Sequence, residues 1–218
     1  MPAASTSPCP MCAGADAAID SPLQRLLPPG ASRFIAQTPR FVAVPTFGCF
    51  VPGYLLIVPR PHVLSFGQLG PGLRREADML ATRLSERIAT VYGMPALGFE
   101  YGNNVPGGRR IEHAHWHLLP SRADLAGWLG QRLCGHKVAG LAGLPGDPAA
   151  SYIAVRTQDK AVTVYPVPSQ QRQRIRLRRV VAGLDPRVNS DDWDFEQARF
   201  PDLIRQTVRD LAPAVRTG

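Results

Sequence analysis

The chain has 218 residues, of which 44% are hydrophobic and 19% are charged. A chain of this length and composition buries a sizeable core, which excludes wholesale disorder. Its formal net charge of +8 favours anionic partners such as nucleotides, polyphosphates, nucleic acids or acidic membranes, although an arginine-rich composition by itself gives the same count.

The first residues lack the apolar stretch of a secretory signal, and the longest apolar run, residues 54–58, is too short to span a bilayer. We therefore expect a soluble, cytoplasmic protein without a membrane segment. Residues 1–16 show no hydrophobic periodicity and are expected to form an irregular arm. Short β-rich runs at residues 33–35, 41–44 and 54–58 are separated by prolines, which predicts a meander of antiparallel strands.

A long helix is predicted between Gly70 and Gly93, because apolar residues recur there at spacings of three and four. We assign its apolar stripe to core packing and give it no chemical role. Two strands follow at residues 96–101 and 111–119, joined by a loop at residues 102–108 that is rich in Gly and Asn.

The segment after residue 121 has a different character. Two β-rich runs there predict a hairpin, and three stretches predict helices. The hairpin covers residues 151–156 and 161–167, and the helices cover residues 124–133, 170–182 and 196–211.

Three of the five histidines, His113, His115 and His117, lie at alternate positions in the second of these strands. Because side chains alternate across a strand, the three imidazoles are expected on one face, with Ala114 and Trp116 against a core on the other. A neutral imidazole is a good nucleophile toward phosphorus near pH 7, and a neighbouring imidazole carries a proton to the leaving group. The pattern favours a phosphoryl-transfer enzyme, with a histidine-rich metal site or incidental surface histidines as alternatives.

Cys9 and Cys12 form a C-x-x-C pair, whose spacing suits two ligands of a tetrahedral Zn²⁺. In a reducing compartment such a pair indicates half a metal site rather than a disulfide. His62, isolated in a proline-flanked turn, is a candidate third ligand. The alternative is that both thiols are free and the arm is mobile. Cys49 and Cys134 stand alone and are predicted to be small buried residues.

Residues 113–119 read His-Ala-His-Trp-His-Leu-Leu. They fit at every position the His-φ-His-φ-His-φ-φ motif, with φ apolar, of the histidine-triad (HIT) superfamily. Residues 51–63 resemble the strand and turn that precede the main helix of that family, and residues 99–108 resemble its strand and glycine loop. The resemblance covers about residues 33–120.

This resemblance implies an α+β fold, in which an antiparallel sheet of about five strands carries one long helix. An extension with a β-hairpin and helices follows. We accordingly divide the chain into a zinc-binding arm (residues 1–16), a HIT core domain (residues 17–122) and a C-terminal extension packed on the core (residues 123–218).

The resemblance also implies catalytic roles. His115 would be the nucleophile, His117 would bind the phosphate and protonate the leaving group, and His113 would be the third member of the triad. Family members attack the α-phosphate of a nucleotide, so we expect a hydrolase of a nucleotidyl ester, anhydride or phosphoramidate that forms a nucleotidyl-His115 intermediate. A histidine at position 117, where the transferase branch typically has Gln, favours hydrolysis over transfer.

The loop before the triad is expected to bind the substrate through Arg109, Arg110, Gly108 and Asn104. Two guanidinium groups in that loop would clamp a phosphate, or they would point into solvent, as arginines in loops usually do. Tyr54 stands where many relatives have a histidine. The substrate is therefore expected to be more anionic than, or different from, the common adenine dinucleotides and phosphoramidates.

Zinc-bearing members of the superfamily are similar in a second respect, since they carry two N-terminal cysteines, a histidine before the main helix and the first triad histidine. The resemblance thus implies Cys9, Cys12, His62 and His113 as four ligands of a closed, structural Zn²⁺ site. It also implies a homodimer.

Other functions stay open at this point. A nucleotidyltransferase, or a nucleic-acid 5′-end deadenylase of the same superfamily, fits the net charge and the basic stretch at residues 172–179, which is alternatively one solvated helix face. A non-catalytic, zinc-stabilised module that binds a nucleotide without cleaving it also fits.

Overall fold

The structure is a computed structural model that describes residues 9–103, 111–147, 150–168, 175–188 and 200–212. Among these residues, no helix is both long enough and apolar enough to cross a membrane.

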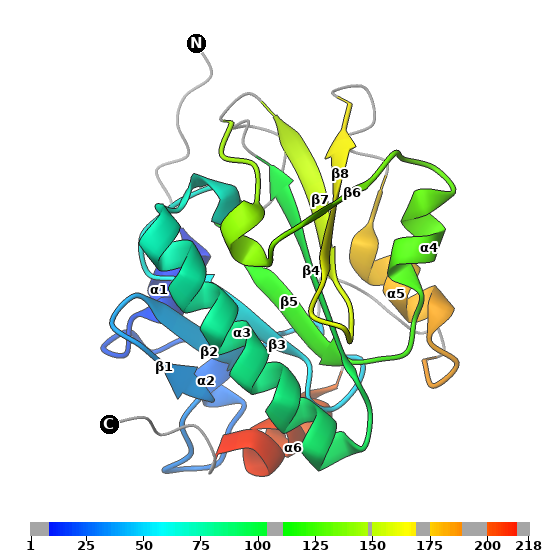
Figure 1. Ribbon diagram of the computed structural model, residues 1–218. Helices are drawn as coiled ribbons and strands as arrows, with labels where there is room; N and C mark the ends of the chain where they lie inside the picture. The colour runs from blue at the N-terminus through cyan, green and yellow to red at the C-terminus, as the bar shows by residue number, and fades with distance from the viewer. Residues whose placement is uncertain (1–8, 104–110, 148–149, 169–174, 189–199, 213–218) are drawn as a thin grey trace.

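One antiparallel sheet runs through the described part of the chain (Figure 1), in the order β1-β2-β3-β5-β4-β7-β8-β6. The α+β class is confirmed, but the sheet has eight strands rather than about five. The reason is that the hairpin β7–β8 pairs with β4, and β6 pairs with β8, so that all three strands continue the same sheet. The strands are β1 (Ala36–Gln37), β2 (Phe41–Pro45), β3 (Leu55–Pro59), β4 (Ala96–Asn103), β5 (Trp116–Pro120), β6 (His136–Val138), β7 (Ser151–Arg156) and β8 (Val162–Val167).

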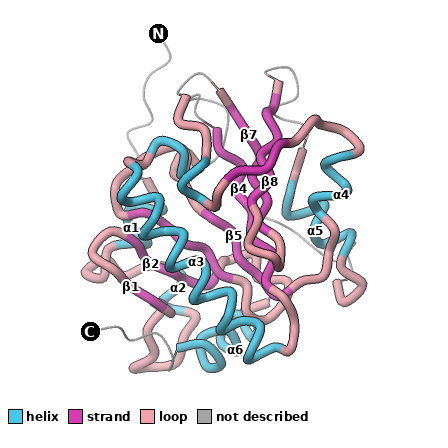
Figure 2. Tube along the Cα trace, in the orientation of Figure 1, coloured by secondary structure: helices cyan, strands magenta, loops and turns pink. Residues whose placement is uncertain are grey.

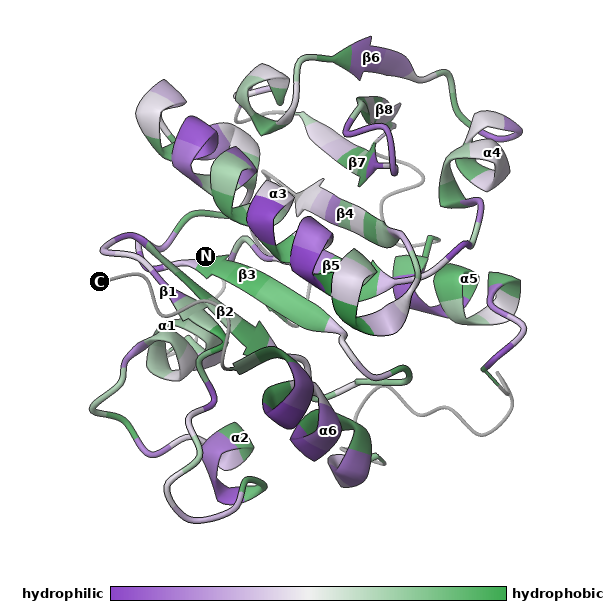
Figure 3. Cartoon of the chain, turned by 60° about the horizontal axis from the view of Figure 1, so that its bottom comes forward, coloured by the Kyte–Doolittle hydropathy of each residue, from purple (hydrophilic) through white to green (hydrophobic). Residues whose placement is uncertain are grey.

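Helix α3 (Pro71–Tyr92) is the long helix of the fold and lies along one face of the sheet (Figures 1 and 2). It begins at a proline, whose fixed φ suits the first helical position, and it ends at Gly93, whose φ of 61° is left-handed. Leu80, Leu84 and Ile88 of its apolar stripe are buried, as the periodicity predicted. Figure 3 shows the hydrophilic residues of α3 on its outer side and β3 apolar along its length.

The remaining helices are short. The predicted helices at residues 124–133, 170–182 and 196–211 correspond to α4, α5 and α6, each shorter than expected in its described part. Besides α3, the helices are α1 (Pro10–Ala15), α2 (Pro22–Arg25), α4 (Leu125–Gly130), α5 (Leu177–Leu184), α6 (Pro201–Leu211) and the 3-10 turns η1 (Phe66–Gln68) and η2 (Leu141–Gly143), as far as the described residues extend.

Three predictions of local structure were wrong. The strand expected at residues 33–35 lies instead at Ala36–Gln37. The arm is not irregular over its described residues, because α1 begins directly after Cys9. The triad strand is shorter than residues 111–119, and it begins only at Trp116, so that His113 and His115 precede it. The physical reason is that the Ala114 N–H leaves the ladder and donates to the Val63 carbonyl at 2.7 Å, which turns this segment toward the chain after β3.

The end of β5 is joined to the extension by a polar cluster around the buried carboxylate of Asp185. Ser121 donates to the Asp185 carboxylate at 2.9 Å, and Arg187 donates both to that carboxylate at 2.6 Å and to the Pro120 carbonyl at 2.6 Å. Burial alone would raise the pKa of Asp185, but the hydrogen bonds from Arg187 and Ser121 outweigh it and hold that pKa below its usual value. The ionised Asp185 thus anchors the segment after α5 to the core.

Candidate active site and metal centre

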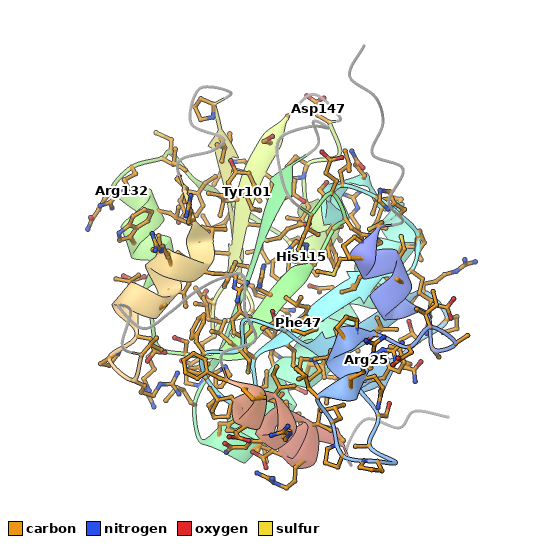
Figure 4. The ribbon with its side chains drawn as sticks, turned by 180° about the vertical axis from the view of Figure 1, so that it is seen from behind. Arg25, Phe47, Tyr101, His115, Arg132 and Asp147 are labelled. Atoms are coloured by element: carbon orange, nitrogen blue, oxygen red, sulfur yellow. The ribbon has the colours of Figure 1, made fainter. Side chains whose placement is uncertain are left out.

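The face of the sheet opposite α3 carries the three alternating histidines. Figure 4 shows His115 near the centre of this face, with α1, α5 and α6 around it. Each of the three imidazoles has a different hydrogen-bond partner, and the partners determine what each ring can do.

His115 is oriented by the backbone. Its Nδ1 lies 2.8 Å from the carbonyl oxygen of His113, and a carbonyl oxygen only accepts. In the neutral ring the proton is therefore on Nδ1, and Nε2 carries the lone pair. The residue is half-buried. This is the arrangement that a nucleophilic imidazole requires.

His117 is buried beside His115, with the two ring centroids 4.9 Å apart. The ring of Phe99 stacks on His117 at 4.5 Å with an angle of 13° between the planes. The Tyr54 hydroxyl lies 2.8 Å from His117 Nδ1. These contacts hold the second imidazole next to the first, at a distance suited to proton transfer around one reacting group.

Tyr54 itself is completely buried. Burial raises the pKa of its hydroxyl far above the usual value, and the charge and hydrogen bonding of Arg178 lower it only in part. The hydroxyl therefore keeps its proton at neutral pH and is available as a donor to His117.

A second cluster lies at the start of α1, next to the triad. The ligand atoms of the four residues predicted to bind metal all lie within 4.8 Å of one another. His113 Nδ1 is 3.5 Å from Cys9 Sγ and 3.4 Å from Cys12 Sγ, and His62 Nδ1 is 3.3 Å from Cys12 Sγ. Tetrahedral Zn²⁺, with bonds of about 2.3 Å to sulfur and about 2.0–2.1 Å to nitrogen, separates such S and N ligands by about 3.6 Å. The cluster has the size of a tetrahedral metal site.

The orientation of His113 also suits a metal. Its Nε2 lies 2.8 Å from the Pro59 carbonyl, so Nε2 carries the proton and the Nδ1 lone pair points toward the two thiols. Metal-binding histidines commonly donate their second N–H to a carbonyl in this way. Burial lowers the pKa of His113, which keeps the ring neutral. The pKa of the Cys12 thiol, in contrast, is raised to about 11 by burial and by the adjoining Cys9.

The structure thus brings Cys9, Cys12, His62 and His113 together, and it places His115 beside His117. The predicted substrate-binding residues Asn104, Gly108, Arg109 and Arg110 lie outside the described residues.

Of the two single cysteines, Cys49 is buried as predicted, whereas Cys134 is exposed, because it follows α4 in a surface segment before β6. No role was predicted for Phe99, Arg178 was predicted only as part of the basic stretch at residues 172–179, and Tyr54 was noted only as a departure from the family pattern. Position 54 carried a signal, because a tyrosine replaced a histidine there.

The HIT domain family model matches residues 30–124. No curated protein matches the chain.

Among solved structures, a hypothetical histidine triad nucleotide-binding protein from Sulfolobus tokodaii is similar with 20% identity and a TM-score of 0.36, over 41% of this chain and 60% of that one, which is less than two thirds of its length. A Hit-like protein involved in cell-cycle regulation from Bartonella henselae is similar with 12% identity and a TM-score of 0.37, over 47% and 74% of the two chains. The yeast Ap4A phosphorylase Apa2 in complex with AMP is similar with 11% identity and a TM-score of 0.38, over 85% and 78%. The histidine pattern, strands β1 to β5 and the long helix α3 fall within the residues that match the HIT domain, 30–124, which make up less than half of the chain.

Proposed function

We propose that this protein hydrolyses a nucleotide at a phosphate ester, anhydride or phosphoramidate bond through a covalent nucleotidyl-His115 intermediate. The observation that carries the proposal is the pair of adjacent imidazoles in different hydrogen-bonding states. His115 has its Nδ1 proton engaged by a carbonyl, which leaves the lone pair on Nε2, and His117 lies beside it as a proton carrier. The HIT-domain match supports the substrate class, and the net charge of +8 suits an anionic substrate.

The reaction follows from these two rings. His115 Nε2 attacks the α-phosphorus and forms a P–N bond, while the bond from phosphorus to the leaving group breaks and His117 gives that group a proton. Water then attacks the same phosphorus, His117 takes its proton, and the P–N bond breaks. The products are a nucleoside monophosphate and the free His115. The Nδ1 hydrogen bond to the His113 carbonyl stabilises the positive charge that His115 gains on attack.

We also propose that Cys9, Cys12, His62 and His113 hold a structural Zn²⁺. Four protein ligands leave no open position for substrate, so the ion would supply no catalytic chemistry of its own. Its effect would be to tie α1 to the chain around β3 and to hold His113, whose carbonyl orients His115.

Hydrolysis and transfer to another acceptor share the first step and differ only in what attacks the intermediate.

Both sheet edges are short, with β1 of two residues and β6 of three, and both sides of β4 are paired within the chain. A homodimer could therefore not form by pairing strand β4 with a second copy of the chain, and it would use another surface.

The test is intact-protein mass spectrometry after rapid, acid-free quenching with a panel of nucleotides. The full chain is compared with His115→Ala and with the matched control His136→Ala, which removes an exposed histidine on β6. We expect a mass increase of one nucleoside monophosphate in the parent and the control, and none in His115→Ala.

Turnover that depends on His115 without a trapped adduct would support the same chemistry with a short-lived intermediate. Turnover that survives His115→Ala would refute the mechanism. Nucleotide binding without turnover across the panel would refute the hydrolase and leave a binding module.

A further inference from the structure

We propose that Tyr54, supported by Arg178 of the C-terminal extension, is a positioning residue that keeps the proton of His117 on Nε2. The two neighbouring imidazoles, His115 and His117, would then hold opposite tautomers. Only the use made of the His117 proton rests on the proposed function; the tautomer itself is a property of the folded protein.

The contact between Tyr54 and His117 allows two arrangements. The hydroxyl and the ring nitrogen Nδ1 are 2.8 Å apart, and either can be the donor. If the hydroxyl donates, Nδ1 is unprotonated and the ring proton is on Nε2. If Nδ1 donates, the ring proton is on Nδ1 and Nε2 is unprotonated, and the Tyr54 hydroxyl has to donate its own hydrogen bond to another acceptor.

Arg178 selects the first arrangement. Its guanidinium has five donors and no acceptor, so it interacts with the Tyr54 oxygen only as a donor and a cation. It lies over the Tyr54 ring, with Cζ 5.8 Å from the ring centroid, and both its charge and its hydrogen bonding act on the hydroxyl. With Arg178 donating to the oxygen, the acceptor that the described contacts offer to the hydroxyl proton is His117 Nδ1. Leaving a buried hydroxyl proton without an acceptor is unfavourable, because the lost hydrogen bonds to water are not replaced.

The position of Arg178 is itself well defined. Its Nη2 donates to the Gly48 carbonyl at 2.7 Å, in the loop between β2 and β3. Gly48 has no side chain, and a Cβ at that position would overlap the guanidinium. Arg178 is the second residue of α5, so its backbone belongs to the extension while its head group lies against the core. This arginine, which the sequence interpretation placed in a basic surface stretch, therefore points inward.

The ring of His117 is also held against rotation. Phe99 stacks on one of its faces, and the ring of His115 meets it at an angle of 68°. Since Nδ1 contacts the Tyr54 hydroxyl, the proposal assigns the other ring nitrogen, Nε2, to the substrate. An Nε2–H donates a proton or a hydrogen bond to a leaving group, whereas the Nε2 of His115 carries a lone pair. Through Arg178, the C-terminal extension thereby helps to fix the tautomer of His117.

The first test reads the tautomer directly. Long-range ¹H–¹⁵N spectra of histidine-labelled, zinc-loaded full chain distinguish protonated from unprotonated ring nitrogens, and a His117→Gln spectrum assigns the signal. We expect the parent His117 to be protonated at Nε2 and unprotonated at Nδ1. Tyr54→Phe and Arg178→Gln should each move the signal toward a mixture or toward the other tautomer. Arg176→Gln, which removes the same charge from an exposed residue two positions away, should leave it unchanged.

The second test separates positioning from folding. With a nucleotide substrate that the parent turns over, Tyr54→Phe and Arg178→Gln should lower kcat by roughly 10- to 100-fold, which is at or below the contribution of general acid catalysis, and should leave KM within about twofold. Metal content and melting temperature report whether the variants fold.

A parent His117 protonated at Nδ1, or a tautomer that does not respond to Tyr54→Phe in a folded protein, would overturn the proposal. A signal unchanged in Arg178→Gln would overturn the part given to the extension. An inactive protein with the expected tautomers would instead count against the proposed hydrolase alone.

Discussion

Removing the metal should loosen the arm and destabilise the whole chain by a measurable amount. The proposed ion joins Cys9 and Cys12, at the start of α1, to His62 and His113 in the core. Chelation, or the substitution Cys12→Ser, breaks these connections without altering any residue of the sheet. The lost stability comes from the freedom that the unfolded chain regains when the cross-link is absent.

The size of the effect follows from the separation of the joined residues. Cys12 and His62 are 50 positions apart. Treated like a cross-link, a closed loop of that length stabilises the folded state by about 4 kcal/mol. Residual binding of the metal to the unfolded chain makes this an upper value. For a chain of this size, 1 kcal/mol corresponds to roughly 2–4 °C, so the melting temperature should fall by as much as about 8–16 °C.

Scanning calorimetry of the zinc-loaded and the chelator-treated protein measures the shift, with the metal content determined on the same samples. Cys134→Ser is the matched control, because this cysteine is exposed and lies outside the cluster. It should melt with the parent and bind the same amount of zinc. A melting temperature that neither chelation nor Cys12→Ser changes would show that the cluster does not hold a stabilising metal.

Two further predictions concern the folded state. The pKa of Asp185 is lowered in the folded chain, so this carboxylate stabilises the fold fully above its unfolded pKa, and the stabilisation is lost as the pH falls through the folded pKa. The substitution Asp185→Asn should therefore lower the free energy of unfolding by about 1–3 kcal/mol at pH 7. In urea unfolding, the difference between this variant and the parent should shrink in acid. An equal difference at every pH would show that the charge paired with Arg187 is not responsible. Gly67→Ala should cost about 1–3 kcal/mol, because the new Cβ would meet the Pro145 carbonyl, whereas Gly72→Ala, in open space in the first turn of α3, should be neutral or stabilising. Equal melting temperatures for these two variants would contradict this reading of the packing.

Much of the fold could be predicted from local patterns. The spacing of apolar residues located α3 within one residue at each end, and the proline-separated β-rich runs located β2 and β3 closely. The hairpin was also found, because alternation and turn residues are local properties of the chain. The strand count was wrong because pairing between β4 and β7 joins segments that no local pattern connects.

The site divides in the same way. The alternating histidines and the C-x-x-C pair are readable in the sequence, because each is a short run of residues at fixed spacing. The exit of His113 and His115 from the strand was not readable, since it depends on the hydrogen bond between Ala114 and Val63.

The residue types and spacings by themselves determined the alternating histidines, the C-x-x-C pair and most of the helix and strand positions, whereas the α+β fold class, the candidate nucleophile and the set of four metal ligands followed from the resemblance to the HIT superfamily. Only the tertiary structure decided which nitrogen of each histidine is engaged, because that depends on partners supplied by distant segments. Tyr54 lies 63 positions from His117 in the chain and contacts it because β3 and β5 are neighbouring strands, and Arg178 is contributed by the extension. A basic stretch has the same composition whether its arginines face solvent or a tyrosine ring, and only the packing of α5 against the core distinguishes the two.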